Sequence, residues 1–352
     1  MSYRLKLLSA LNRLIAPSHA ELVDRAELHA LRELRGDSNA FLAPSFKSWE
    51  PPENASAYLR PTNPRLQEIR RLYKHLNHPA ADHSLWAGSY LSDELTWKFF
   101  RGDNPYVWQL RRLPQPEAKY ALATYYARSI DKLGLFAALN EDGAFGAYTY
   151  TIGGTLVSRD LLDSIIEISF LEQQLGLSRV AALNVLDIGA GYGRFAHRLV
   201  TALPNVASVL CADAIPESHF LCEYYLRFRG IEQRTKVITL PEIDTTLSAY
   251  PVGLAVNMHA FSECTLSSIS WWLNTLQSHR IKFLMIVPSP SDHGGTKLLS
   301  REQNGEKLDF LPVIGNAGYK LRIRAPKYAA DHTVQKHAYF PTHYYLFELA
   351  ES

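Results

Sequence analysis

The chain has little cysteine, no long apolar run and no excess of charge of one sign. Its 352 residues include only three cysteines, Cys211, Cys222 and Cys264, all within expected strands or helices of the second half. That placement does not suit a disulfide framework, so we expect a reducing, cytoplasmic location. No stretch is apolar for long enough to cross a bilayer, and none is of low complexity. A membrane span is therefore not expected.

The charge composition does not indicate electrostatic binding of a highly charged macromolecule. The formal net charge is +2, and the two signs are interspersed along the chain. Such a surface creates no field strong enough to hold nucleic acid, so a nucleic-acid partner is not expected. With 47% hydrophobic residues, the length suits one large domain or two ordinary ones. We expect residues 1–140 to form a mainly helical, aromatic-rich cap region and residues 141–352 a second domain.

The N-terminal part contains helical and aromatic patterns. Leucines recur at helical spacing in residues 4–15 with basic residues between them, which favours an amphipathic helix packed on protein over one lying on a membrane. A second helix is expected over 18–34, and a proline-rich connector over 41–64. Aromatic residues from Trp86 to Leu110 favour a helical core over a sugar-stacking surface, although a cap over a site can combine both.

Local signals then predict a helix, a hairpin and a second helix. The helix is expected over 117–133, and the hairpin over 145–157 with its turn at two glycines. Ser158 has the character of an N-cap for an amphipathic helix over 159–175, which closes at Gly176.

The central motif is residues 184–194, Asn-Val-Leu-Asp-Ile-Gly-Ala-Gly-Tyr-Gly-Arg. An apolar strand ends at Asp187, and Gly189, Gly191 and Gly193 follow before a helix begins. Glycines let the backbone approach a ligand, and a helix N-terminus offers free N–H groups, which indicates a nucleotide-type site. The dinucleotide fingerprint places its third glycine one residue later, which weakens the nicotinamide interpretation. A glycine turn can also serve only close packing of helix on strand.

A second carboxylate strengthens the nucleotide interpretation. The apolar segment 206–212 ends at Asp213, 20 residues beyond Gly193. A carboxylate at this place in a doubly wound fold accepts hydrogen bonds from ribose hydroxyls. The acidic residue, the Gly-x-Gly-x-Gly run and Asp213 together resemble the first motifs of class I S-adenosylmethionine-dependent methyltransferases. This resemblance implies S-adenosylmethionine as the cofactor.

Strands and helices alternate from residue 183 onward. Such alternation predicts an α/β fold with a doubly wound, mostly parallel sheet and right-handed crossovers. With two closing strands, the count resembles the seven-stranded, Rossmann-like methyltransferase sheet. The strands are expected over 184–188, 206–212, 235–240, 252–258, 281–287, 318–324 and 343–349.

Candidate catalytic residues follow the fourth and fifth strands, because ligands of such sheets bind beyond the carboxyl ends. We expect Asn257 to contact the cofactor, His259 to be the general base and Glu263 to orient it. A hydrogen-bonded structural histidine is the competing interpretation. His293, in a loop with two glycines, is the second candidate base. Weaker candidates for substrate contacts are His332, His337 and His343.

The same region argues against two other chemistries. Methyltransferases acting on base amino groups are expected to carry Asn-Pro-Pro-Tyr here, whereas this chain has Asn-Met-His-Ala at 257–260. Adjacent carboxylates suited to a metal do not occur at this position, so no metal is expected. Before the glycine motif, Asp163 and Glu167 share a helix face that is usually solvated. Glu167 is also a candidate contact to the cofactor's amino-acid end or to the substrate.

From about residue 141 to its C-terminus the chain resembles the bacterial sugar O-methyltransferase family. This resemblance implies methyl transfer to a hydroxyl of a sugar or glycan-type small-molecule acceptor. Asp187 departs from the glutamate of many relatives, which keeps the carboxylate but shortens its reach. The resemblance rests on 157–162, 186–194, the Glu223-Tyr224-Tyr225-Leu226 segment after Asp213, and 257–263.

Two classes of function remain open. One is an O-methyltransferase whose N-terminal part caps the site, with methylation of a natural product or a protein side chain as the alternative. The other is a methyltransferase-like binding or assembly subunit without turnover. Both carboxylates, the glycines and a histidine at the methyl-facing edge favour the enzyme. The sequence does not fix the oligomeric state, and a homo-oligomer is compatible with it.

Overall fold

The computed structural model describes residues 11, 50–81, 95–102, 116–290 and 293–350. Several N-terminal expectations fall outside these residues. They are the helix over 4–15 apart from Leu11, the helix over 18–34, the first part of the connector over 41–64, and most of the aromatic stretch from Trp86 to Leu110. No helix within the described ranges is long and apolar enough to cross a membrane.

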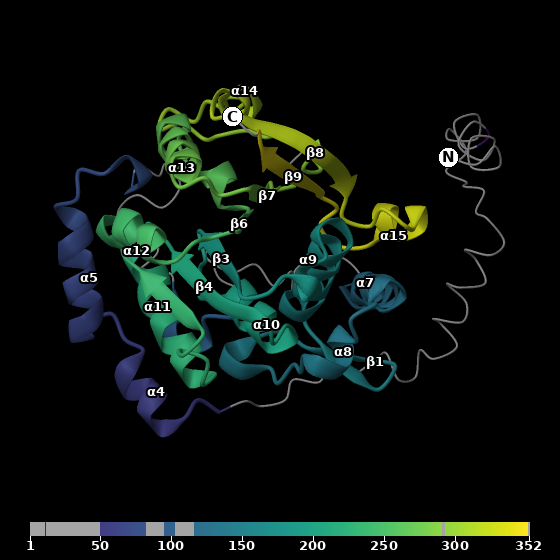
Figure 1. The fold of residues 1–352 in the computed structure, drawn as a ribbon. Coiled ribbons are helices and arrows are strands. Elements are labelled where there is room, and N and C mark those ends of the chain that lie inside the picture. Colours follow the sequence, from purple (N-terminus) through teal and green to yellow (C-terminus); the bar gives the residue numbers. More distant parts are fainter. Residues whose placement is uncertain (1–10, 12–49, 82–94, 103–115, 291–292, 351–352) are drawn as a thin grey trace.

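A seven-stranded sheet runs through the centre of the molecule (Figure 1). Its strand order is β5-β4-β3-β6-β7-β9-β8. The strands from β5 to β7 in this order pair in parallel, whereas β9 is antiparallel to both of its neighbours, β7 and β8. The expected doubly wound, mostly parallel sheet is confirmed. The strands are β3 (Leu183–Ile188), β4 (Val206–Ala212), β5 (Thr235–Ile238), β6 (Leu254–Met258), β7 (Phe283–Val287), β8 (Tyr319–Pro326) and β9 (His343–Leu349).

The sheet extends to both sides of the central strand β3. β3 pairs with β4 on one side and with β6 on the other, so the strand order reverses between them. This is the switch point at which open α/β sheets bind ligands. The connecting helices are α10 (Arg194–Ala202), α11 (Pro216–Phe228), α12 (Ile243–Ala249), α13 (Leu266–Ser278), α14 (Leu311–Asn316) and α15 (His332–His337).

The elements before β3 form where local signals predict them. The Ser158 hydroxyl accepts a hydrogen bond from the Leu161 N–H (3.1 Å), and Gly176 ends the helix in a left-handed conformation. The predicted caps of this helix are therefore confirmed, as is the hairpin turn at its two glycines. The elements are α7 (Pro116–Ile130), α8 (Leu135–Ala138), β1 (Tyr150–Ile152), β2 (Thr155–Val157) and α9 (Arg159–Leu175).

The described N-terminal segments lie on opposite sides of the molecule (Figure 1). Helices α4 (Glu53–Tyr58) and α5 (Pro64–Lys74) lie beside α11, whereas α7 packs on α9 and on the C-terminal helix α15. Arg65 and Arg70 of α5 pair with Glu223 and Glu217 of α11 at 2.6 and 2.7 Å. Ion pairs and packing thus join this region to the sheet's helices. The division into 1–140 and 141–352 stays a prediction.

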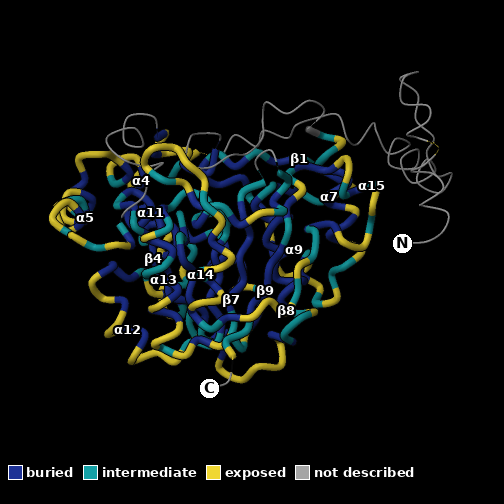
Figure 2. The backbone as a smooth tube through the Cα atoms, turned by 90° about the horizontal axis from the view of Figure 1, so that it is seen from above, coloured by how far each residue is buried: buried dark blue, intermediate teal, exposed yellow. Residues whose placement is uncertain are grey.

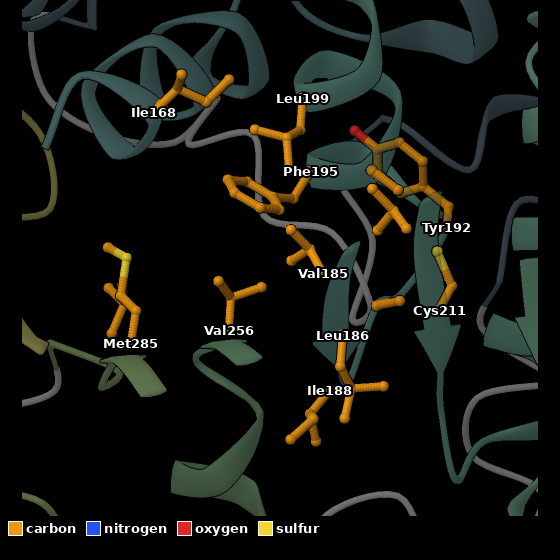
Figure 3. Packing of buried hydrophobic residues seen from close by; sticks show 14 of the residues in the cluster. Ile168, Val185, Leu186, Ile188, Tyr192, Phe195, Leu199, Cys211, Val256 and Met285 are labelled. Carbon is orange, nitrogen blue, oxygen red and sulfur yellow. The ribbon is translucent and has the colours of Figure 1, made fainter. Parts of the chain in front are cut away.

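The core holds the strand ends in place. Figure 2 shows the central strands buried beneath exposed loops and outer helices. In Figure 3, side chains from several elements gather around β3, with Ile168 of α9 and Phe195 and Leu199 of α10 above Val185. Each such buried side chain contributes roughly 1.5–3 kcal/mol, before the entropy of ordering it is counted. Packing on both faces therefore fixes the loops that follow β3 and β4.

Candidate active site

A cleft of about 840 Å³ opens beyond the carboxyl ends of β3, β4, β6 and β7. Its size suits a small organic ligand. One wall carries the glycine loop, and the short turn η2 (Pro79–Ala81) contributes Ala80 from the N-terminal region. The cleft brings together most of the predicted site residues, which are Asp187, Gly189, Gly191, Asp213, Asn257, His259, Glu263 and His293.

Packing alone requires two of the three motif glycines. Gly189 and Gly193 have φ values of 73° and 87°, in the left-handed region that favours glycine. A Cβ on Gly189 would collide with that of Ala260, and one on Gly193 would lie 3.0 Å from Cys222 Sγ. Gly193 does not line the cleft. The glycine motif therefore does not by itself establish a ligand site, and the carboxylates must carry that argument.

Asp213 joins the loops after β3 and β4. Its Oδ2 accepts a hydrogen bond from the Gly191 N–H, and its Oδ1 accepts one from the Ile215 N–H, both at 2.9 Å. Each carboxylate oxygen can accept a second bond, so capacity remains for ligand hydroxyls. Burial raises the pKa of Asp213 to about 6, which means that burial destabilises the ionised form of this carboxyl.

Asp187 lies at the end of β3, only 2% exposed, and lines the same cleft. Burial raises the pKa of Asp187 to about 7, partly offset by the charge of Arg194. A cationic ligand beside this carboxyl would favour its ionised form. The cleft therefore combines two buried acids in a way that suits a ligand carrying positive charge and hydroxyl groups.

We expect Asp187→Asn to flatten the pH dependence of stability. Because the pKa of Asp187 is about 7 in the folded protein and lower when unfolded, its protonated form stabilises the fold below about pH 4. That contribution, roughly 2–4 kcal/mol, is lost as pH rises through 7. Urea unfolding of the ligand-free protein between pH 4 and 8 measures it. A wild-type profile as flat as that of the variant would contradict the assignment.

Asp163 and Glu167 are buried, so the expectation of a solvated face is wrong. Glu167 binds Arg194 through two contacts of 2.7 and 3.1 Å, and Arg194, not Glu167, reaches the cleft. Asp163 receives Lys327 Nζ at 2.5 Å and the Tyr339 hydroxyl at 3.1 Å. The face is charged because its two acids pair with buried cations of other elements, Arg194 and Lys327. A direct contact from Glu167 to a ligand has no support in this geometry.

The Asn257 side chain connects two backbone segments that line the cleft. It is fully buried, its Nδ2 donates to the Ile188 carbonyl (3.0 Å), and its Oδ1 accepts from the Phe261 N–H (2.9 Å). The amide therefore ties the end of β3 to the turn η7 (Ala260–Glu263). Its predicted contact with a cofactor stays a prediction.

His259 stands at the cleft in a left-handed backbone conformation with φ 71°. Its N–H donates to the Val287 carbonyl at 2.7 Å, which ties the loop after β6 to β7. Burial lowers the pKa of the imidazole to about 3, and the nearby Arg159 lowers it further. This value lies well below 6.5, the usual pKa of a histidine side chain. The ring is neutral at physiological pH.

The two candidate bases present unpaired ring nitrogens. Within the described residues, Nδ1 of His259 and Nδ1 of His293 are both buried without a hydrogen-bond partner. Glu263 lines the same wall, and its predicted role in orienting His259 stays a prediction. Their catalytic roles stay predictions. The weaker candidates His332, His337 and His343 do not line the cleft.

A buried ion network behind the glycine loop was not predicted. Arg101, which is fully buried, donates to Glu141 (2.9 Å), Asp160 (3.3 Å) and the Tyr192 hydroxyl (3.3 Å). Tyr192 belongs to the glycine loop, and its hydroxyl donates to Asp160. Glu141 also accepts from Arg198 of α10 at 2.9 Å. The only sequence signal was an aromatic residue within the glycine run.

The strand order, the antiparallel β9 and the cleft at the switch point define a Rossmann-like fold of the class I methyltransferase type. No protein-family model and no curated protein matches the sequence. Magnesium protoporphyrin IX methyltransferase from Synechocystis PCC 6803 with bound SAH is 12% identical over 55% of this chain and 86% of that one, with a TM-score of 0.38. The cyclase SpnF is 14% identical over 66% and 94%, with a TM-score of 0.39. A methyltransferase from Clostridium acetobutylicum is 11% identical over 53% and 91%, with a TM-score of 0.38. These likenesses are distant and concern the fold alone.

Proposed function

We propose that the protein is an S-adenosylmethionine-dependent methyltransferase that acts on a hydroxyl of a sugar or glycan-type acceptor. The observation that carries the proposal is the Asp213 carboxylate, bonded to the Gly191 N–H at the switch-point cleft. A packing role for the glycines would not need this buried acid to face a cavity. The sugar acceptor rests on the family resemblance, and polar side chains of the cleft wall such as Ser262 and Ser289 are compatible with it.

The donor set fits S-adenosylmethionine. Asp213 offers acceptor positions for the two ribose hydroxyls, and Asp187 offers a carboxylate for the ammonium group. Burial raises the pKa of both acids, so the sulfonium and ammonium charges of the cofactor would interact with them more strongly here than in water. When bound, the cofactor supplies a methyl carbon activated by the adjacent sulfonium. The remaining work is alignment of the acceptor and removal of its proton.

His259 would accept that proton. Its buried Nδ1 lacks a partner among the described residues and can accept a hydrogen bond from the acceptor hydroxyl. Because burial lowers the pKa of the imidazole to about 3, the ring is a weak base that stays ready to accept at any physiological pH. It would orient the hydroxyl in the ground state and take the proton late, as the new bond forms.

We expect His259→Ala to lower kcat by about 10²-fold, at the low end of general-base effects because the base is weak. At saturating cofactor, the wild-type rate should show no inflection near pH 6.5, since the pKa of His259 lies near 3. Rate measurements from pH 5.5 to 8.5 check both points. His332→Ala, an exposed histidine away from the cleft, is the control. A wild-type inflection near 6.5 that His259→Ala abolishes would contradict the lowered pKa.

The assignment is tested by titrating S-adenosylmethionine and S-adenosylhomocysteine into the purified protein, followed by mass spectrometry of sugar acceptors. Binding of both ligands and a mass gain of one methyl group would support the proposal. Absence of binding would reject it. Binding without turnover of any acceptor in the panel would favour the non-catalytic binding subunit.

A further inference from the structure

A two-armed loop between β7 and α14 forms one rim of the cleft. Its arms are held by backbone hydrogen bonds from Phe310 to Leu298 (2.9 Å), from Ser300 to Leu308 (2.8 Å) and from Glu302 to Glu306 (2.8 Å). The last two bonds lie on either side of position 301 on one arm and position 307 on the other. This register sets Arg301 directly opposite Lys307, with both side chains on the same face.

This pair places two cations at the cleft. Arg301 and Lys307 both line it, and both are exposed. Neither side chain has an ion pair or hydrogen bond within the described residues. The Arg301 N–H donates to the Cys264 carbonyl at 2.9 Å, which fixes this arm against the cleft wall. Like charges directly opposite each other destabilise a strand pair, so the pair does not stabilise the loop.

The neighbouring acids are engaged elsewhere. Glu302 Oε1 accepts from the Leu266 N–H (2.9 Å) and from the Ser300 hydroxyl (2.6 Å), on the opposite face of the arm. Asp309 Oδ1 accepts from the N–H of Leu311, the first residue of α14, at 2.9 Å. Deeper in the cleft, Arg159 adds a further cation, 3.4 Å from Asp163. The acids that line the cleft are Asp160, Asp187, Asp213 and Glu263.

We propose that Arg301 and Lys307 bind an anionic group of the acceptor, so that the substrate is a phosphorylated or otherwise anionic sugar and not a neutral one. The inference deepens the proposed function and rests on it for the identity of the sugar. A guanidinium fork and an ammonium group together match a phosphate monoester, which offers three oxygens and close to two negative charges. An anion at this place also complements a cationic cofactor in the same cleft.

The test compares matched probes on the same protein. Glucose 1-phosphate, glucuronate and glucose are titrated into the protein in the presence of S-adenosylhomocysteine. We expect the two anionic probes to bind more tightly than glucose. The probe with the higher affinity identifies the preferred anionic group as phosphate or carboxylate. Arg301→Gln and Lys307→Gln should each weaken that binding roughly tenfold, whereas Lys297→Gln, an exposed lysine nearby, should not. Equal binding of glucose, or variants that bind like wild type, would overturn the inference.

Charge reversal separates binding from folding. Lys307→Glu would place a carboxylate opposite Arg301, so we expect a melting temperature equal to or above that of wild type together with loss of anion binding. A lower melting temperature with anion binding retained would contradict the role of the pair. Titration of S-adenosylmethionine into the same samples tests the proposed function separately. If S-adenosylmethionine does not bind while the anionic probes do, the methyltransferase proposal is rejected and the anion site is retained.

Discussion

Replacing Asp213 by alanine is expected to lower the affinity for S-adenosylmethionine by about 10²-fold or more. Hydrogen bonds to a charged acceptor contribute about 1.5–3 kcal/mol each, and two ribose hydroxyls would lose theirs. The substitution also removes the acceptor of the Gly191 and Ile215 N–H groups, so the loop after β3 is no longer tied to the loop after β4. Both effects weaken binding.

Calorimetric titration measures the loss, and urea unfolding shows whether the variant is folded. Asp213→Asn keeps the shape and one acceptor oxygen, so its affinity should lie between those of wild type and alanine. Asp244→Ala removes an exposed acid on α12 and should leave binding unchanged. An affinity of Asp213→Ala within threefold of wild type would mean that the carboxylate does not contact the ligand.

The fold could be predicted from local signals. Apolar runs that end at an acid or a glycine indicate buried parallel strands, and each expected strand from 184–188 to 343–349 matches an observed one within two residues. Ser158 and Gly176 identified both ends of α9 because capping depends on the residues at the helix ends alone. Periodicity and capping are local properties, so one sequence suffices to read them.

The electrostatics of the site could not be predicted in this way. Burial of Glu167 depends on Arg194, which is near in sequence, but that of Asp163 depends on Lys327, which is more than 160 residues away. The lowered pKa of His259 follows from burial and from cations on other elements. Such properties arise only once the chain is folded. Most of the candidate residues line the cleft, and their roles stay predictions, whereas their charge states and partners depend on residues that only folding brings near.

The largest loss of stability is expected from Glu141→Ala. The Glu141 carboxylate is fully buried and accepts hydrogen bonds from Arg101 (2.9 Å), Arg198 (2.9 Å) and Ser158 (2.5 Å). Its removal leaves two buried guanidinium groups without that counter-charge, and breaking one side of a buried ion pair costs about 3–5 kcal/mol. The free energy of unfolding, measured in urea at pH 7, should fall by this amount. Glu68→Ala, an exposed acid paired with Arg65, should change it by less than about 1 kcal/mol.

The effect should reach the cofactor as well, because the same network supports the glycine loop. Arg101 contacts both Asp160 and the hydroxyl of Tyr192, so a displaced Arg101 would free the loop that carries Gly191. The two arginines hold the pKa of Glu141 below its usual range, so its contribution to stability is present above about pH 4 and is lost as pH falls further. The wild type should therefore lose part of its advantage over the variant in acid. A wild-type advantage that is as large at pH 3 as at pH 7 would show that Glu141 acts through packing, and the loop would then owe its position to the core beneath β3.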